Sequence, residues 1–107
     1  MIIARVESGV CRFHAEIRAV KSQNKTVRII IKSDCEQVTA LGNELKEIGI
    51  RDILTTPVTK NPVYEKAGKC HLHPACPVPC GIIKSAEIEM GLALLRNVSI
   101  EFQNEGP

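Results

Sequence analysis

The chain has 107 residues, of which 44% are hydrophobic and 24% are charged, and its formal net charge is +2. These values predict one soluble globular domain over residues 1–107 and exclude a disordered tail, a multidomain chain and a transmembrane protein. Five cysteines stand against one tyrosine, two phenylalanines and no tryptophan, so we expect an aliphatic core and an excess of thiols.

The first third of the chain alternates apolar and polar residues with the period of two that is typical of β-strands. We expect strands over residues 2–6, 12–19 and 27–33. Polar turn residues separate them at 8–9 and 22–25. The second and third strands have their apolar side chains at odd-numbered positions. This alternation predicts that each strand has one buried and one exposed face.

Two helix starts follow. Ser33-Asp34-Cys35-Glu36 fits a capping box with Ser33 as the N-cap. The helix after it has an apolar stripe that ends at Gly49, formed by Val38, Leu41, Leu45 and Ile48. Residues 50–60 read as a connector. Asn61-Pro62 then predicts a second helix, which Cys70 closes, because asparagine is a good N-cap and proline is tolerated at the first helical position.

The last part of the chain begins with a proline-rich loop over residues 71–79, which excludes regular helix. A third helix is expected from Cys80 or Gly81 to about Leu92, and a last strand alternates over residues 98–103. Strands grouped ahead of helices indicate a two-layer α+β fold. We expect an antiparallel meander of three N-terminal strands and one C-terminal strand, covered on one face by two to three helices.

Strand pairing predicts that two of the cysteines meet. A three-residue loop between the second and third strands pairs residues whose numbers sum to 46, which places Cys11 opposite Cys35. A loop shifted by one residue raises the sum to 48 and moves Cys35 opposite Phe13. Both registers put the two thiols at the open end of the hairpin, on the face covered by helices.

The segment from Cys70 to Cys80 is dense in metal ligands, with three thiols and the imidazoles of His71 and His73 in eleven residues. Cysteine thiolates select zinc, copper(I) or an iron–sulfur cluster over hard cations. The cysteine spacings match neither a zinc ribbon nor a bacterial ferredoxin.

We therefore expect a metal site with an iron–sulfur cluster or zinc as cofactor. A cluster would use four thiolates, for instance Cys11, Cys35, Cys70 and Cys76, with Cys80 or His73 as a spare or replacement. Zinc would be held equally well by three cysteines and His73.

Two other functions remain open. Cys76 or Cys80, with His73 as a base and Lys69 or Lys84 nearby, could form a thiol-redox or Cys-nucleophile enzyme. Alternatively, the thiols fill the core of a structural or interaction protein, because free cysteine is often buried as a small hydrophobe.

Partners and location follow from the same composition. Mixed charges and few aromatic residues disfavour a nucleic-acid partner, and no apolar stretch is long enough for a membrane. An odd number of cysteines and an N-terminus without signal-peptide features predict the reducing cytoplasm. An apolar strand at a sheet edge could also pair with a protein partner or a second copy in a homodimer.

Three cysteine-containing segments carry a family resemblance, namely residues 8–11, 33–35 and 69–79, followed by Gly91-Leu92-Ala93-Leu94. Together they resemble a family of small uncharacterised proteins from anaerobic archaea and bacteria. The resemblance implies that Cys11, Cys35, Cys70 and Cys76 act as a unit and that Cys80 departs from the pattern. An anaerobic source would favour an iron–sulfur cluster over zinc.

Overall fold

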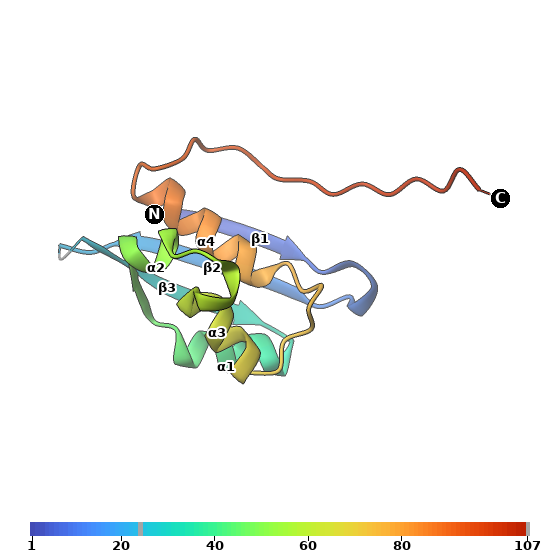
Figure 1. Ribbon diagram of the computed structural model, residues 1–107, viewed down its shortest axis with the longest axis horizontal. Helices are drawn as coiled ribbons and strands as arrows, with labels where there is room; N and C mark the ends of the chain where they lie inside the picture. The colour runs from blue at the N-terminus through green and yellow to red at the C-terminus, as the bar shows by residue number, and fades with distance from the viewer. Residues whose placement is uncertain (24, 107) are drawn as a thin grey trace.

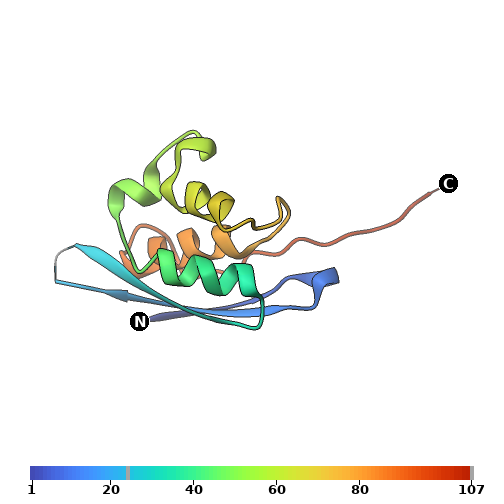
Figure 2. The same ribbon diagram turned by 90° about the horizontal axis from the view of Figure 1, so that it is seen from below.

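The computed structural model describes residues 1–23 and 25–106, which form an antiparallel sheet with helices on one face (Figures 1 and 2). The strands lie in the order β1-β2-β3-β4. They are β1 (Ile2–Glu7), β2 (His14–Lys21), β3 (Thr26–Ser33) and β4 (Glu47–Gly49). The helices are α1 (Glu36–Glu44), α2 (Ile50–Leu54), α3 (Pro62–Lys69) and α4 (Val78–Glu89), with short 3-10 turns η1 (Gly9–Cys11) and η2 (Val58–Lys60). The α+β fold predicted from the sequence is confirmed.

The core lies between the sheet and the helices. The odd-numbered apolar residues of β2 and β3 are buried, as the alternation predicted, and they are Ala15, Ile17, Ala19, Val27 and Ile29. α4 packs across β1 and β2, α1 packs on β3, and α3 lies against α1 and α4. The helices contribute aliphatic side chains to the core, among them Val38, Leu41, Val63, Val78, Ile82 and Ala86. None of the helices in the described residues has the length and hydrophobicity needed to cross a bilayer.

The position of the fourth strand differs from the prediction. Residues 98–103 belong to no strand, and the fourth strand is Glu47–Gly49, which pairs with β3 through Val27 and Ile48. α1 ends at Glu44, just after Gly42 and Asn43, which are weak helix formers. Ile48 is therefore buried from a strand, whereas the sequence pattern placed it on a helix stripe.

Two helix starts and the connector at residues 50–60 also differ from the prediction. The N-cap of α1 is Cys35, not Ser33, because Ser33 still belongs to β3 and its Oγ accepts a hydrogen bond from the Cys35 amide at 3.1 Å. The predicted connector contains the short helix α2. α4 begins at Val78, before Cys80, because a proline in the first helical turn, here Pro79, costs no intrahelical hydrogen bond.

The β2–β3 hairpin adopts the second of the two expected registers. Ala15 pairs with Ser33 and Ile17 with Ile31, so paired numbers sum to 48. Asn24, part of the predicted turn, lies outside the described residues. The register moves Cys35 one rung away from Cys11 while leaving both at the same end of the sheet.

α4 approaches the sheet closely at Gly81. A Cβ at this position would lie 3.1 Å from Cγ2 of Val6 and 3.2 Å from Cδ1 of Ile17. We expect Gly81→Val to lower the free energy of unfolding by about 1–3 kcal/mol, because two added methyl groups would push α4 off β1 and β2. Gly68→Val is the control, since an added Cβ on this exposed face of α3 meets no atom within 4 Å. Urea denaturation followed by circular dichroism measures both, and an equal effect at the two glycines would contradict the close approach.

Candidate functional site

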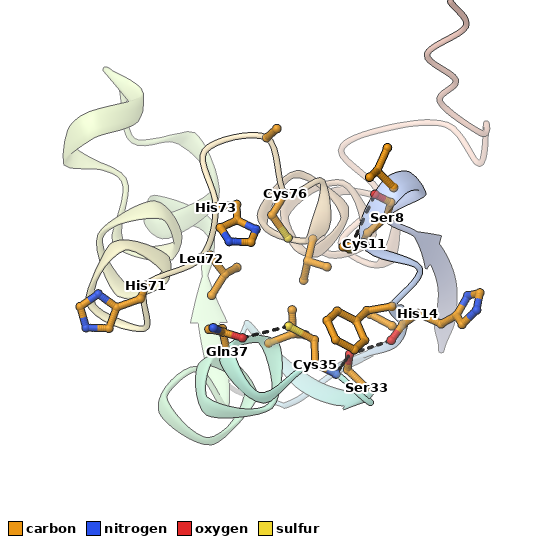
Figure 3. A pocket seen from close by; sticks show the side chains of 16 residues that line it. Ser8, Cys11, His14, Ser33, Cys35, Gln37, His71, Leu72, His73 and Cys76 are labelled. Atoms are coloured by element: carbon orange, nitrogen blue, oxygen red, sulfur yellow. Dashed lines mark hydrogen bonds between the residues drawn. The ribbon is translucent and has the colours of Figure 1, made fainter.

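A pocket of about 420 Å³ opens at the end of the sheet where β2 begins and β3 ends (Figure 3). Three of the five cysteines line it, Cys11, Cys35 and Cys76, and they come from η1, the start of α1 and the loop before α4. His71 and His73 also belong to its wall. The rest of the wall is mainly apolar, with Val10, Phe13, Ala15, Val38, Leu72, Ala75 and Val78.

Hydrogen bonds between the ends of β2 and β3 bring Cys11 and Cys35 together. The Ser33 hydroxyl donates to the His14 carbonyl oxygen at 2.7 Å, and the His14 amide donates to Oδ1 of Asp34 at 3.0 Å. These bonds hold the start of β2 beside the turn that leads into α1. The sequence prediction that Cys11 and Cys35 share one end of the sheet is thereby confirmed.

Each of these two thiols has a local acceptor. Sγ of Cys11 donates to the Ser8 carbonyl oxygen at 3.8 Å, within the η1 turn. Sγ of Cys35 donates to Oε1 of Gln37 at 3.4 Å, and Cys35 itself is the N-cap of α1. Both bonds are weak because sulfur is a poor donor, so neither holds its thiol firmly.

The proline-rich loop supplies the third thiol. The Cys76 amide donates to the His73 carbonyl oxygen at 3.0 Å, which closes a tight turn over residues 73–76. The imidazole of His73 lies beside Cys76, and the sulfurs of Cys76 and Cys35 point into the same space, whereas His71 and His14 point outward (Figure 3). Of the three histidines, His73 is therefore the one that is oriented toward the thiols (Figure 3).

Two predicted ligands lie elsewhere. Cys70 is the C-cap of α3 and packs against the hydrophobic core. Cys80 lies in the first turn of α4 near Tyr64 of α3, and burial together with this neighbouring thiol raises the pKa of Tyr64. Neither Cys70 nor Cys80 lines the pocket in the described part of the chain. Cys35 and Cys76 also pack against the core, but unlike Cys70 they line the pocket as well.

The environment of Cys76 favours the protonated thiol. Burial raises the pKa of Cys76 above its usual value; a backbone hydrogen bond at Val78 lowers it, and the negative charges of Cys35 and Cys11 raise it further. Desolvation and like charges both penalise the thiolate. A bound cation would reverse the electrostatic part of this penalty.

Sequence reasoning missed most of the side chains that surround the thiols in the pocket, among them Phe13 and Gln37. Phe13 forms part of the apolar wall, and Gln37 accepts the hydrogen bond from Cys35. The only signal for Gln37 was its place two residues after Cys35 in the first turn of a helix. Among residues 1–23 and 25–106, no group of three or more His, Cys, Asp or Glu side chains is already placed to hold a metal ion.

Comparison with known proteins gives a family but no characterised relative. A search of the curated proteins and a search of the solved structures give no match. A protein-family model matches residues 2–102, which include all five cysteines and nearly the whole chain. On this match the chain belongs to a family of unknown function, DUF6951.

Proposed function

We propose that the protein binds a thiophilic metal in the pocket, through Cys11, Cys35 and Cys76, with His73 as the fourth ligand. The observation that carries the proposal is the convergence of three free thiols on one apolar pocket from three separate elements of the chain. Scattered core cysteines give no reason for such a convergence.

The ligand set favours zinc over an iron–sulfur cluster. Three cysteines and one histidine form a common structural zinc site, whereas clusters are usually held by four thiolates. Cys70 and Cys80, which could have supplied a fourth thiolate, lie outside the pocket. A cluster in this pocket would need His73 at one iron.

Metal binding must draw the ligands together. Cys11 lies on the exposed turn η1, whose neighbour Val10 is fully exposed. We infer that η1 closes over the pocket when the metal binds, while Cys35 and Cys76 move little because they are anchored to α1 and α4. The pocket then supplies an apolar shell that limits access of water to the thiolates.

A reactive-thiol enzyme has less support. Cys76 has the required neighbour in His73, but a nucleophilic cysteine needs a lowered pKa, and that of Cys76 is raised. Cys80, the other candidate nucleophile, does not line the pocket to which His73 belongs. The five free thiols are compatible with the reducing cytoplasm that we propose as the location.

Titration of the anaerobically purified chain with Co²⁺, followed by displacement with Zn²⁺, tests the proposal. We expect stoichiometric Co²⁺ binding with thiolate-to-metal charge-transfer absorption and the intense visible bands of tetrahedral cobalt, both lost when Zn²⁺ is added. A parallel reconstitution with iron and sulfide should give no stable cluster; a stable cluster would replace zinc by iron–sulfur as the cofactor.

Two results would overturn the metal proposal. One is the absence of stoichiometric binding of Zn²⁺, Co²⁺ and iron–sulfur alike. The other is rapid alkylation of Cys76 alone at neutral pH that added Zn²⁺ does not slow, which would identify a reactive thiol instead.

A further inference from the structure

The chain after α4 forms an extended arm. The positive φ of 75° at Gly91 turns the chain, and residues 92–106 contain no helix or strand. The arm passes along the outside of β1 and α4 and then projects beyond the body of the domain in both views (Figures 1 and 2). Its far part therefore touches little of its own domain.

The arm has the pattern of a strand without a partner. Val98, Ile100 and Phe102 alternate with Ser99, Glu101 and Gln103. The three apolar residues are 62%, 75% and 93% exposed. A period-two row of exposed aliphatic and aromatic side chains is typical of a segment that is buried on one face by another sheet or helix.

β1 offers the complementary edge. It is the first strand in the sheet order and pairs only with β2 among the described residues. Its outer amide and carbonyl groups are thus open for pairing with another extended chain. The faces also match, because Ile2, Ala4 and Val6 are half-buried toward α4, whereas Ile3, Arg5 and Glu7 are more exposed.

A groove of about 450 Å³ runs along this edge. β1 forms one wall, α4 contributes Gly81, Lys84, Ser85 and Ile88, and residues 95–98 at the start of the arm form the other wall. Extended backbone on two sides and a helix on the third fit an extended segment better than a helix or a compact ligand. The basic side chains of Arg5 and Lys84 at the groove favour an acidic segment.

We propose that two copies of the chain exchange their arms, so that residues 98–103 of each copy pair with the outer edge of β1 of the other. The arm supplies what the groove requires: an extended segment of the same length as β1, alternating apolar residues for the α4 side, and Glu101 for the side of Arg5. Residues 95–98 lie beside the groove of their own copy, but the rest of the arm projects away from the domain, so the groove of a second copy is the one within reach of residues 99–103. This dimer does not depend on the metal site, since no β1 residue lines the pocket with the thiols.

Light scattering on the full chain, metal-free and with reductant present, tests the exchange. We expect a dimer whose amides at residues 98–103 and 2–6 are protected from hydrogen exchange, with protection that falls as the chain is diluted. Ile100→Lys should raise the dissociation constant at least about 10-fold, because it places an unpaired charge on the buried face. Ser99→Lys adds the same charge one residue earlier, on the opposite face, and should leave the dimer intact.

Three outcomes would overturn the proposal. A native monomer whose arm is protected at every concentration would show that the arm docks on its own β1. A monomer with an unprotected arm would show that the arm has no partner in a second copy. A dimer that survives Ile100→Lys, or that leaves residues 98–103 unprotected, would place the interface elsewhere.

Discussion

The Cys35→Ser variant is expected to bind zinc about 100-fold more weakly than the native chain while unfolding at the same or a higher urea concentration. Structural zinc sites contribute about 10–16 kcal/mol in apparent free energy at neutral pH, so one of four ligands contributes about 3 kcal/mol, or about 100-fold in Kd. Competition against a chelator of known affinity measures the change.

The Cys35→Ser variant distinguishes the loss of a metal ligand from the loss of the fold. Cys35 is the N-cap of α1, with the extended backbone that an N-cap adopts, and its side chain makes no capping hydrogen bond. Serine is among the best N-cap residues, so its hydroxyl should support α1 better than the thiol does. A weaker zinc affinity in this variant therefore reports on the ligand and not on unfolding.

Cys80→Ser is the matched control. It makes the same chemical change in the first turn of α4, at a half-buried position that does not line the pocket. We expect its zinc affinity to stay within about 2-fold of the native value, well below the change expected for loss of a ligand. If Cys80→Ser and Cys35→Ser weaken zinc binding equally, or if neither weakens it, the assignment of ligands is wrong.

The second large effect is expected at Asn61, a residue that is only 2% exposed. Oδ1 accepts a hydrogen bond from the Val63 amide at 2.9 Å and caps α3. Nδ2 donates to the carbonyl oxygens of Asp52 at 2.7 Å and Thr55 at 3.3 Å. One buried amide thus joins the end of α2 to the start of α3.

Asn61→Ala should lower the free energy of unfolding by about 2–4 kcal/mol. Loss of the cap accounts for about 1 kcal/mol, and the carbonyl groups left without a donor account for the rest. Circular dichroism during urea denaturation is the suitable measurement, because the chain has one tyrosine and no tryptophan.

Two further variants serve as comparisons for Asn61→Ala. Asn61→Asp retains the cap acceptor but turns a carboxylate toward two carbonyl oxygens, so it should be at least as destabilising as alanine. Asn43→Ala changes an exposed asparagine of α1 and should alter stability by no more than about 0.5 kcal/mol. An Asn61→Ala variant as stable as Asn43→Ala would show that the three hydrogen bonds contribute little.

Much of the sheet could be predicted because its signal is local. The alternation in β2 and β3 identifies the buried face without knowledge of any partner, and the buried residues Ile17 and Ile29 confirm it. The signal for the start of α3 was equally local, since Asn61 and Pro62 act within one turn of the helix. For the β2–β3 hairpin, the sequence left two registers open. Both keep the apolar residues of the two strands on the same face, so the alternation cannot distinguish them.

The errors came from segments whose structure depends on distant partners. Residues 98–103 have the pattern of a strand, but they form none within their own chain, because pairing is not encoded in the segment itself. Ile48 is compatible with a helix stripe and with a strand, and the pairing of β4 with β3 decides between them. Two or three apolar residues are too few to distinguish the two periods.

For the candidate site, the sequence by itself determined which side chains are available and at which end of the sheet two of them lie. The thiols and His73 are the residues on which the proposed metal site depends, and the odd-numbered apolar positions of both hairpin strands place Cys11 and Cys35 at the same end. Only the tertiary structure decided which other thiols join them. Cys70 and Cys76 belong to the same ligand-dense segment and both pack against the core, but only Cys76, held by the turn at residues 73–76, also lines the pocket. The physical reason is that the path of a loop is set by the packing of α3 and α4 on the sheet, which involves contacts between residues far apart in the chain.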